Sequence, residues 1–260
     1  GGCCGVLATV QAYILKALLY GDNNSCECTE PLRPSRNDIR SALVQALTDI
    51  LWQAGSSNAI AQTVTLETEF NFESMLDNLT YIEYTSKKSL EEGIINHLDY
   101  FSTPGSNGCL LFVISALLSR GIQSVIGDMD DETCSLIGDN GFCSLELVNL
   151  LLTGYAVSNV FDNSLQIDSC TLRGINSRAN IGFLSLYEHY NSCQVGSNLK
   201  TPRYPIWVVN SENHFTVLFS CQKELVSDWR AERQFVLYHY DAMHSTPHTK
   251  LTVGKFNKMS

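Results

Sequence analysis

The segment that decides the fold opens the chain: residues 1–20 read GGCCGVLATVQAYILKALLY. Its apolar residues recur at close to helical spacing, which predicts a helix over residues 6–20 that ends at Gly21. Cys4 lies between glycines just before the first turn of this helix. Backbone N–H groups at a helix start have no partner within the helix, and the helix dipole is positive there. Both effects favour a thiolate at Cys4, and the thiolate is the nucleophilic form of cysteine.

The elements predicted after this helix change from helices to strands along the chain. Helical patterns occupy residues 38–54, with Asn37 or Asp38 as N-cap, and then residues 89–101, 110–120, 145–152 and 182–190. Strand patterns occupy residues 60–72, 204–209, 214–220 and 234–240, and loops are expected over residues 22–37 and 121–141. Helices first and strands later predict an α+β fold with an antiparallel sheet in its C-terminal part. Because no repeat or linker divides the chain, we expect one domain over residues 1–260.

Composition and charge exclude several classes of partner. The chain has 44% hydrophobic and 17% charged residues, a balance that builds a buried core. Its formal charge of -10 repels phosphate backbones and anionic lipids, so we expect neither nucleic acid nor membrane surfaces as partners. The longest apolar run, Cys109–Leu118, is about half of the roughly 20 residues that a bilayer crossing needs, and predicts a buried element. The first residues do not resemble a signal peptide, and the absence of Met at residue 1 predicts that the natural N-terminus lies upstream.

The ten cysteines show no repeated spacing. A chain of this length needs no disulfide framework, so we interpret them mostly as free thiols of a reducing compartment, cytoplasmic or nuclear. Cys26 and Cys28 form half of a possible zinc site, but a structural zinc needs four ligands and no second paired cluster is present. The chain also lacks a P-loop and a GxGxxG motif before a helix. We therefore expect no metal and no cofactor.

Six histidines compete for the role of general base. His97 and His189 fall in predicted helices, His244 and His248 in a Ser/Thr/Pro-rich segment, and His239 in an aromatic strand. His214 differs because it stands where the polar stretch 210–213 gives way to an apolar strand. A base at the mouth of a buried strand is held rigidly and stays accessible. Asp241 follows the next strand and is a candidate to orient His214, but a turn residue at a strand end fits its position equally well.

Cys4 and His214 are 210 residues apart in the sequence, in the order that papain-like cysteine proteases use. A nucleophile at the start of the first long helix and a base at the start of a late strand meet when the fold closes the gap between them. We therefore expect the His214 imidazole to lie near the Cys4 sulfur, with the first helix packed against the strand that begins at His214.

The residues around both positions resemble one family. GGCCGVLATVQ, residues 1–11, is similar to the GGPCGVLA-type nucleophile motif of the MINDY deubiquitinases. LKTPRYPIWVVNSENHFTVLFS, residues 199–220, resembles the segment that carries the catalytic histidine of that family, and residues 141–162 and 181–202 resemble its core. The likeness extends from Gly1 to about Tyr240. It implies a papain-like core in which Cys4 is the nucleophile and His214 the base.

The resemblance also implies an activity, namely hydrolysis of isopeptide bonds in polyubiquitin, with a preference for the proteasome-targeting linkage. The sequence departs from the family pattern at Cys3, where the motif usually has proline. The family also takes an oxyanion-hole glutamine from just upstream of the motif, before residue 1. These two departures keep open the alternative of a ubiquitin-binding pseudoenzyme of the same fold.

Overall fold

The structure is a computed structural model and describes residues 3–21, 34–56, 61–66, 79–168, 170–241 and 248–254. Its first half is mainly helical. The helices are α1 (Cys4–Tyr20), α2 (Arg36–Ala54), α3 (Lys87–Asn96), α4 (Leu98–Ser102), α5 (Gly108–Arg120), α6 (Ile122–Asp128) and α7 (Leu145–Thr153). A hairpin of β1 (Ala61–Leu66) and β2 (Leu79–Tyr84) joins them, packed on α5.

The second half carries the main sheet. Its strands are β5 (Gly182–Ser185), β6 (Ile206–Ser211), β7 (His214–Phe219), β8 (Gln234–Tyr240) and β9 (His248–Gly254), hydrogen-bonded in that order. Short helices connect them: α8 (Leu186–His189), α9 (Ser197–Lys200), η3 (Lys223–Val226) and η4 (Ala231–Arg233). The predicted α+β class is confirmed, but the sheet is antiparallel only from β6 to β9, because β5 pairs parallel to β6.

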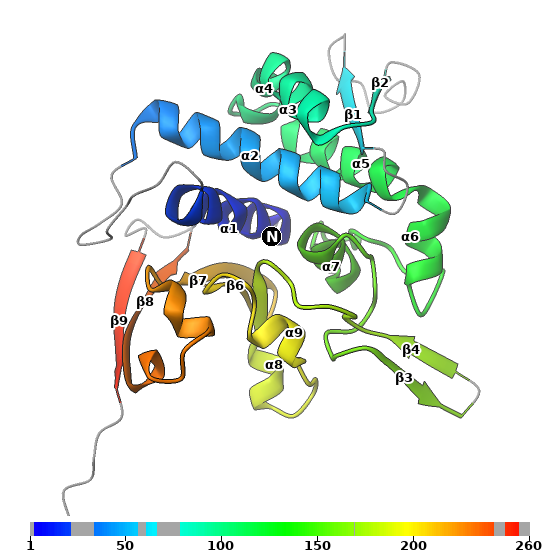
Figure 1. Cartoon of the computed structure of the whole chain (residues 1–260). Helices are drawn as coiled ribbons and strands as arrows, with labels where there is room; N and C mark the ends of the chain where they lie inside the picture. The colour runs from blue at the N-terminus through cyan, green and yellow to red at the C-terminus, as the bar shows by residue number, and fades with distance from the viewer. Residues whose placement is uncertain are drawn as a thin grey trace, which may run out of the picture.

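Helix α1 lies between the two halves (Figure 1). It contacts α2 and α7 on one side and β6 and β7 on the other. Because α1 is covered on two sides, its apolar residues are not confined to one face of the helix. Ala8, Ala12, Tyr13 and Leu15 are all buried. The predicted packing of this helix against the strand that begins at His214 is confirmed.

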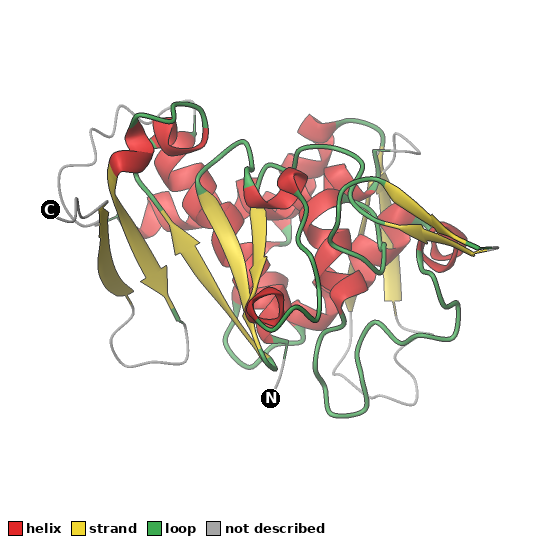
Figure 2. Ribbon diagram, turned by 90° about the horizontal axis from the view of Figure 1, so that it is seen from below, coloured by secondary structure: helices red, strands yellow, loops and turns green. Residues whose placement is uncertain are grey.

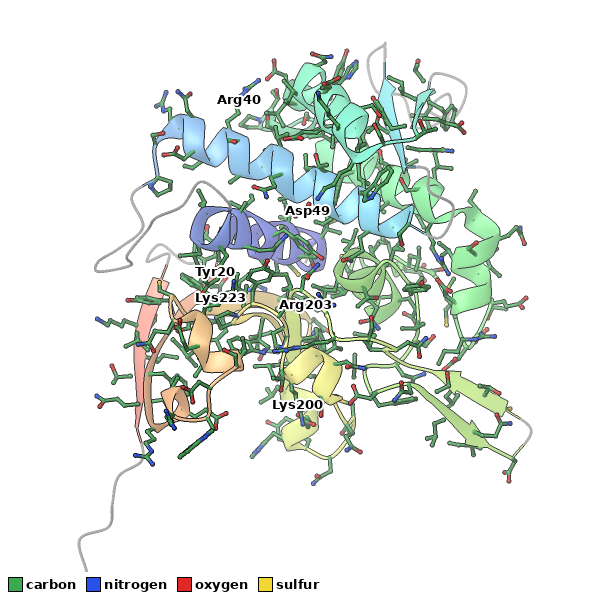
Figure 3. All side chains as sticks on the ribbon, viewed as in Figure 1. Tyr20, Arg40, Asp49, Lys200, Arg203 and Lys223 are labelled. Carbon is green, nitrogen blue, oxygen red and sulfur yellow. The ribbon has the colours of Figure 1, made fainter. Side chains whose placement is uncertain are left out.

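Polar contacts fix α1 along its length. Lys16 pairs with Asp49 of α2 at 2.5 Å, and Asp49 also pairs with Lys87 at 2.6 Å. At the C-terminal end of α1 the Tyr20 hydroxyl donates to the Ser220 carbonyl at 2.6 Å, just after β7 (Figure 3). The helix is thereby tied to both layers, which limits the movement of its first residues relative to the sheet.

The predicted apolar run over residues 109–118 forms most of α5, with Leu111, Phe112 and Val113 buried. Within the described residues no single helix is long and apolar enough to cross a membrane. Taken together, α5 and α6 are long and apolar enough, but their axes are bent by 83° relative to each other.

Several predicted boundaries were wrong. The N-cap of α2 is Ser35, not Asn37 or Asp38, because Ser35 and Asp38 form a reciprocal capping box. The helix expected over residues 89–101 breaks at His97 into α3 and α4. The loop expected over residues 121–141 contains α6, and the helix expected over residues 182–190 is the strand β5 followed by one turn of helix.

The short elements β2, α9, η3 and η4 were not predicted, and neither were two larger features. The hairpin of β3 (Ser164–Ile167) and β4 (Cys170–Arg173) projects at the opposite end of the molecule from β9 (Figure 2). Strand β9 occupies part of the segment taken as loose Ser/Thr/Pro sequence. Most of the loop expected over residues 22–37, with Cys26 and Cys28, lies outside the described residues, and so do residues 67–72 of the strand pattern at 60–72.

Candidate active site

Cys4 is the first residue of α1, and Cys3 is its N-cap. The first helical hydrogen bond runs from the Leu7 N–H to the Cys3 carbonyl at 3.0 Å. A side chain at the next position would be crowded, because a Cβ on Gly5 would meet Cys143 Cβ and Val148 Cγ2, each at 3.0 Å. The close approach of α7 and the loop before it to Gly5 fixes the position of the neighbouring Cys4 backbone.

His214 is the first residue of β7 and pairs with Ser211 across a two-residue turn, Glu212 and Asn213. Glu212 takes a φ of 57° to make the turn. Phe215 and Val217 of the same strand are buried, so the strand is anchored while the His214 side chain remains 33% exposed. A rigid but accessible imidazole is what general-base chemistry needs.

The fold brings Cys4 and His214 to one pocket of about 930 Å³, which both line. The Cys4 thiol donates to the backbone carbonyl of Asn213, the residue before His214, with a sulfur-to-oxygen distance of 3.7 Å. The helix start and the strand start therefore meet in one cleft, as the sequence order predicted.

Asp241 contacts the ring of His214. Its carboxylate Oδ1 lies 3.0 Å from His214 Nε2, and the residue is buried. If Nε2–H donates to Asp241, the neutral ring has Nδ1 as its remaining acceptor. Of the two interpretations left open by the sequence, the structure supports an orienting carboxylate rather than a simple turn residue.

The other histidines of the described segments lie elsewhere. His97 Nδ1 lies 2.9 Å from the Gly93 carbonyl at the break between α3 and α4, and His189 ends α8 against the Tyr190 ring. His239 Nε2 lies 2.9 Å from the Thr216 hydroxyl oxygen. None of these three lines the pocket that contains Cys4. His244 and the side chain of His248 lie outside the described part of the chain.

Comparison with known proteins places the chain in a family. The family model "Deubiquitinating enzyme MINDY-3/4, conserved domain" matches residues 1–260. The chain belongs to this family. The motif resemblance at Cys4 and His214 is thus part of a match over the whole sequence.

Individual relatives agree with the family match. "Probable ubiquitin carboxyl-terminal hydrolase MINDY-4" of Mus musculus is 46% identical over 255 residues, covering 94% of this chain and 34% of the relative. "Ubiquitin carboxyl-terminal hydrolase MINDY-3" of Bos taurus is 36% identical over 259 residues, covering 87% of this chain and 57% of the relative. The chain therefore spans about a third of the MINDY-4 relatives' length and just over half of the MINDY-3 relatives'. No solved structure matches it.

The pocket of this MINDY-3/4 domain is mostly apolar. Leu7, Val10 and Ile14 of α1 form one wall, and Val217 and Tyr240 of the sheet form the facing wall. Leu7, three residues after Cys4, is 57% exposed.

Phe142 was missed by the sequence analysis. It lines the pocket of Cys4 and also a second hollow of about 380 Å³, and the turn residues Glu212 and Asn213 border both. The loop of Phe142 approaches α1 only through tertiary packing, and no local pattern marks it. Only its two neighbours, Gly141 and Cys143, are small residues that permit a close approach.

Cys143 follows Phe142 in the loop before α7, and its side chain packs beside Gly5 in the first turn of α1. Burial raises the pKa of the Cys143 thiol, and hydrogen bonds from the Val6 and Gly5 N–H groups act in the opposite direction. The sulfur thus accepts from two of the N–H groups that a helix start leaves without an internal partner. The Cys4 N–H, one residue earlier, also precedes the first helical hydrogen bond.

Within the described segments of the MINDY-3/4 domain, no group of three or more His, Cys, Asp or Glu side chains could hold a metal ion. The half-site of Cys26 and Cys28 lies outside those segments.

Proposed function

We propose that this domain is a cysteine-type deubiquitinase that hydrolyses isopeptide bonds in polyubiquitin chains. The observation that carries the proposal is the pocket shared by Cys4 and His214, with the His214 ring bonded to buried Asp241. The relatives' printed names, ubiquitin carboxyl-terminal hydrolases, supply the substrate class.

In the proposed reaction His214 Nδ1 takes the proton of the Cys4 thiol, and the thiolate attacks the carbonyl carbon of the C-terminal glycine of ubiquitin, whose bond to the lysine nitrogen then breaks. Asp241 holds the ring with Nε2–H donated to its carboxylate and stabilises the imidazolium that forms. The imidazolium then protonates the lysine amine as it leaves. His214 next activates water, which hydrolyses the thioester and frees Cys4.

The developing oxyanion requires a donor close to the sulfur. We assign the backbone N–H of Cys4 to this role, because the N–H groups of Gly5 and Val6 face the Cys143 thiol. The family resemblance adds a glutamine upstream of residue 1 as the second donor. Loss of one oxyanion donor costs on the order of 10²–10³ in rate in a serine protease.

Three features support a papain-like core in a single catalytic domain. The nucleophile opens a helix, the base opens a strand, and one cluster of buried side chains runs from Val6 to Phe219 through both halves. All eight cysteines of the described residues are free thiols, consistent with a reducing compartment. The preference for the proteasome-targeting linkage is proposed from the family resemblance alone.

The second candidate is a ubiquitin-binding pseudoenzyme. It is favoured by the Cys4 thiol donating to the Asn213 carbonyl rather than to an imidazole nitrogen. Catalytic hydrogen bonds are often long or misaligned in substrate-free enzymes, so this contact alone does not rule out proton transfer from Cys4 to His214. Turnover of polyubiquitin by the domain with its thiols reduced separates the two candidates.

The deciding experiment compares His214→Ala with His239→Ala. We expect His214→Ala to lower turnover of polyubiquitin by about 10³-fold or more and to leave chain binding nearly unchanged, because the base acts on chemistry. His239→Ala, on the neighbouring strand and outside the pocket, is the matched control and should keep its turnover. Equal turnover in the two variants contradicts the proposal, and chain binding without turnover in the wild type supports the pseudoenzyme.

A further inference from the structure

The turn before His214 contains a backbone conformation that is unfavourable for its residue. Within the described segments, four residues other than glycine have a positive φ: Asn163, Asp168, Asn191 and Glu212. Asn and Asp adopt this left-handed region several times more often than other residues do. Glu212, with a φ of 57°, is the exception, so the surrounding structure must hold it there.

The side chain of Asn210 is the group that holds this turn. Its Nδ2 donates to the carbonyl oxygen of Glu212 at 3.1 Å, and its Oδ1 accepts from the Ser185 hydroxyl at 3.5 Å. Asn210 is buried in β6, where it pairs with Ser185 of β5 and with Phe215 of β7. The amide is therefore fixed between paired strands and bonds to the peptide that joins Glu212 to Asn213.

That peptide determines where the next two residues lie. The carbonyl of Asn213 accepts from the Cys4 thiol, with a sulfur-to-oxygen distance of 3.7 Å, and His214 pairs with Ser211 to close the turn. Relaxation of Glu212 to a negative φ rotates the peptide and carries the Asn213 carbonyl away from the sulfur. The left-handed conformation is thus a condition for the contact between the turn and the nucleophile.

We propose that Asn210 is a positioning residue for the reaction. By holding Glu212 in its left-handed conformation, it keeps Asn213 and His214 in place beside Cys4. Asn210 lines the second hollow and not the pocket of Cys4, so it acts through the turn and not on the reacting atoms. Its effect on turnover rests on the proposed function, whereas its effect on the Cys4 thiol does not.

The first test is a double-mutant cycle on kcat that combines Asn210→Ala with Glu212→Gly. Glycine adopts a positive φ about as readily as a negative one, so it takes the turn conformation without strain. We expect Asn210→Ala to lower kcat on polyubiquitin at least about tenfold, because a displacement of about 1 Å at a catalytic group can cost on the order of 10²-fold. KM should change little, and the loss should be several-fold smaller in the Glu212→Gly background. An equal loss in both backgrounds, or no loss, overturns the proposal.

Two control variants separate the turn from other roles of Asn210. Ser185→Ala removes only the contact to Oδ1, and Asn198→Ala removes a comparable bond, from Nδ2 to the Ile175 carbonyl at 2.8 Å, away from both hollows. Both should nearly keep kcat, and a loss in either as large as that of Asn210→Ala overturns the proposal. If Asn210→Ala is unfolded at the assay temperature, Asn210→Asp replaces it in the cycle. It keeps the volume and loses the amide donor, and any effect of its charge is the same in both backgrounds.

The second test does not need turnover. In a Cys3→Ala background, the pH dependence of alkylation by iodoacetamide, followed by mass spectrometry of the N-terminal peptide, reports the thiolate of Cys4. A thiol that donates to a neutral carbonyl is stabilised in its protonated form. Because the Cys4 thiol donates to Asn213, we expect Asn210→Ala to move the alkylation midpoint to lower pH, and to move it less in the Glu212→Gly background.

The other titratable groups around this thiol stay the same when Asn210→Ala is introduced into either background. They are Cys143, His214, Tyr240 and Asp241, with Glu212 where it is retained. An unchanged or raised midpoint in Asn210→Ala, or an equal shift in both backgrounds, overturns the positioning role. If the reduced wild type shows no turnover of polyubiquitin, the proposed function fails, and the alkylation midpoints still decide whether Asn210 places the turn beside Cys4.

Discussion

At the scale of single residues, the contact between His214 and Asp241 decides how the proposed base is oriented. With Nε2 bonded to the carboxylate at 3.0 Å, Nδ1 is the nitrogen left for Cys4. Asp241 touches neither substrate nor the reacting sulfur in this mechanism, so it is a positioning residue.

We expect Asp241→Ala to lower kcat on the order of 10²-fold, because the ring loses its fixed orientation and tautomer. Asp241→Asn keeps an oxygen that can accept from Nε2–H but loses the charge that stabilises the imidazolium, so its kcat should fall less than that of Asp241→Ala. Steady-state kinetics on polyubiquitin, with KM and the melting temperature followed in parallel, checks both variants. If Asn impairs kcat as severely as Ala at equal folding, the carboxylate charge is required and the positioning role is wrong.

The sequence marked Cys4 and His214 as candidates because each stands at a visible boundary, a glycine turn before a helix and a polar stretch before a strand. Asp241 was only one of two interpretations, because its distance from His214 depends on the register between β7 and β8, where Val217 pairs with Tyr240. Register is fixed by packing and turn geometry and not by either strand alone.

At the scale of elements, the start of α1 depends on the absence of a side chain at Gly5. A methyl group there meets both Cys143 Cβ and Val148 Cγ2 at 3.0 Å, so two neighbouring side chains must shift to admit it. Overpacking of this kind costs about 1–3 kcal/mol, more than the 0.5–1 kcal/mol that Ala gains over Gly in a helix.

Gly5→Ala should therefore lower both the free energy of unfolding and the turnover, because it displaces the residue after the nucleophile. Gly127→Ala in α6 is the matched control, since a Cβ there meets nothing within 4 Å. That variant should be neutral or slightly more stable, by up to about 1 kcal/mol. Urea denaturation and a turnover assay of both variants test this, and an unaffected Gly5→Ala would contradict the packing argument.

The capping box of α2 gives a second prediction for an element. Ser35→Ala should cost about 1 kcal/mol of unfolding free energy, because the Asp38 N–H loses its side-chain acceptor. Asn37→Ala, at a position that the sequence analysis had favoured as N-cap, should cost much less. Urea denaturation compares the two, and a larger loss in Asn37→Ala would restore the original assignment.

Each wrong prediction of an element has an identifiable physical cause. β5 has four residues and is held by parallel pairing with β6, more than twenty positions later, which no local pattern reveals. α6 follows directly on α5 at Gly121, whose φ of 87° turns the chain between the two helices. Ser35 and Asp38 had the spacing of a capping box, so the N-cap of α2 was visible in the sequence.

At the scale of the whole molecule, the proposed site is assembled from both halves. The helical half supplies Cys4 and the sheet supplies His214 and Asp241, and α1 is packed between the halves so that they meet at its first residue. The change from helices to strands along the chain was predictable from periodicity, and the contact of α1 with β7 was predicted from the order of Cys4 and His214. The loop of Phe142, the parallel strand β5 and the edge strand β9 follow from tertiary packing and were not predictable.

The central claim, that Cys4 is the nucleophile served by His214, is tested most directly by a ubiquitin probe with a C-terminal electrophile. The account predicts one covalent adduct per chain, which digestion and mass spectrometry map to Cys4. The adduct should form in Cys3→Ala, be absent in Cys4→Ala, and form much more slowly in His214→Ala. An adduct that maps to Cys3, or that forms at the wild-type rate in Cys4→Ala, would contradict the account.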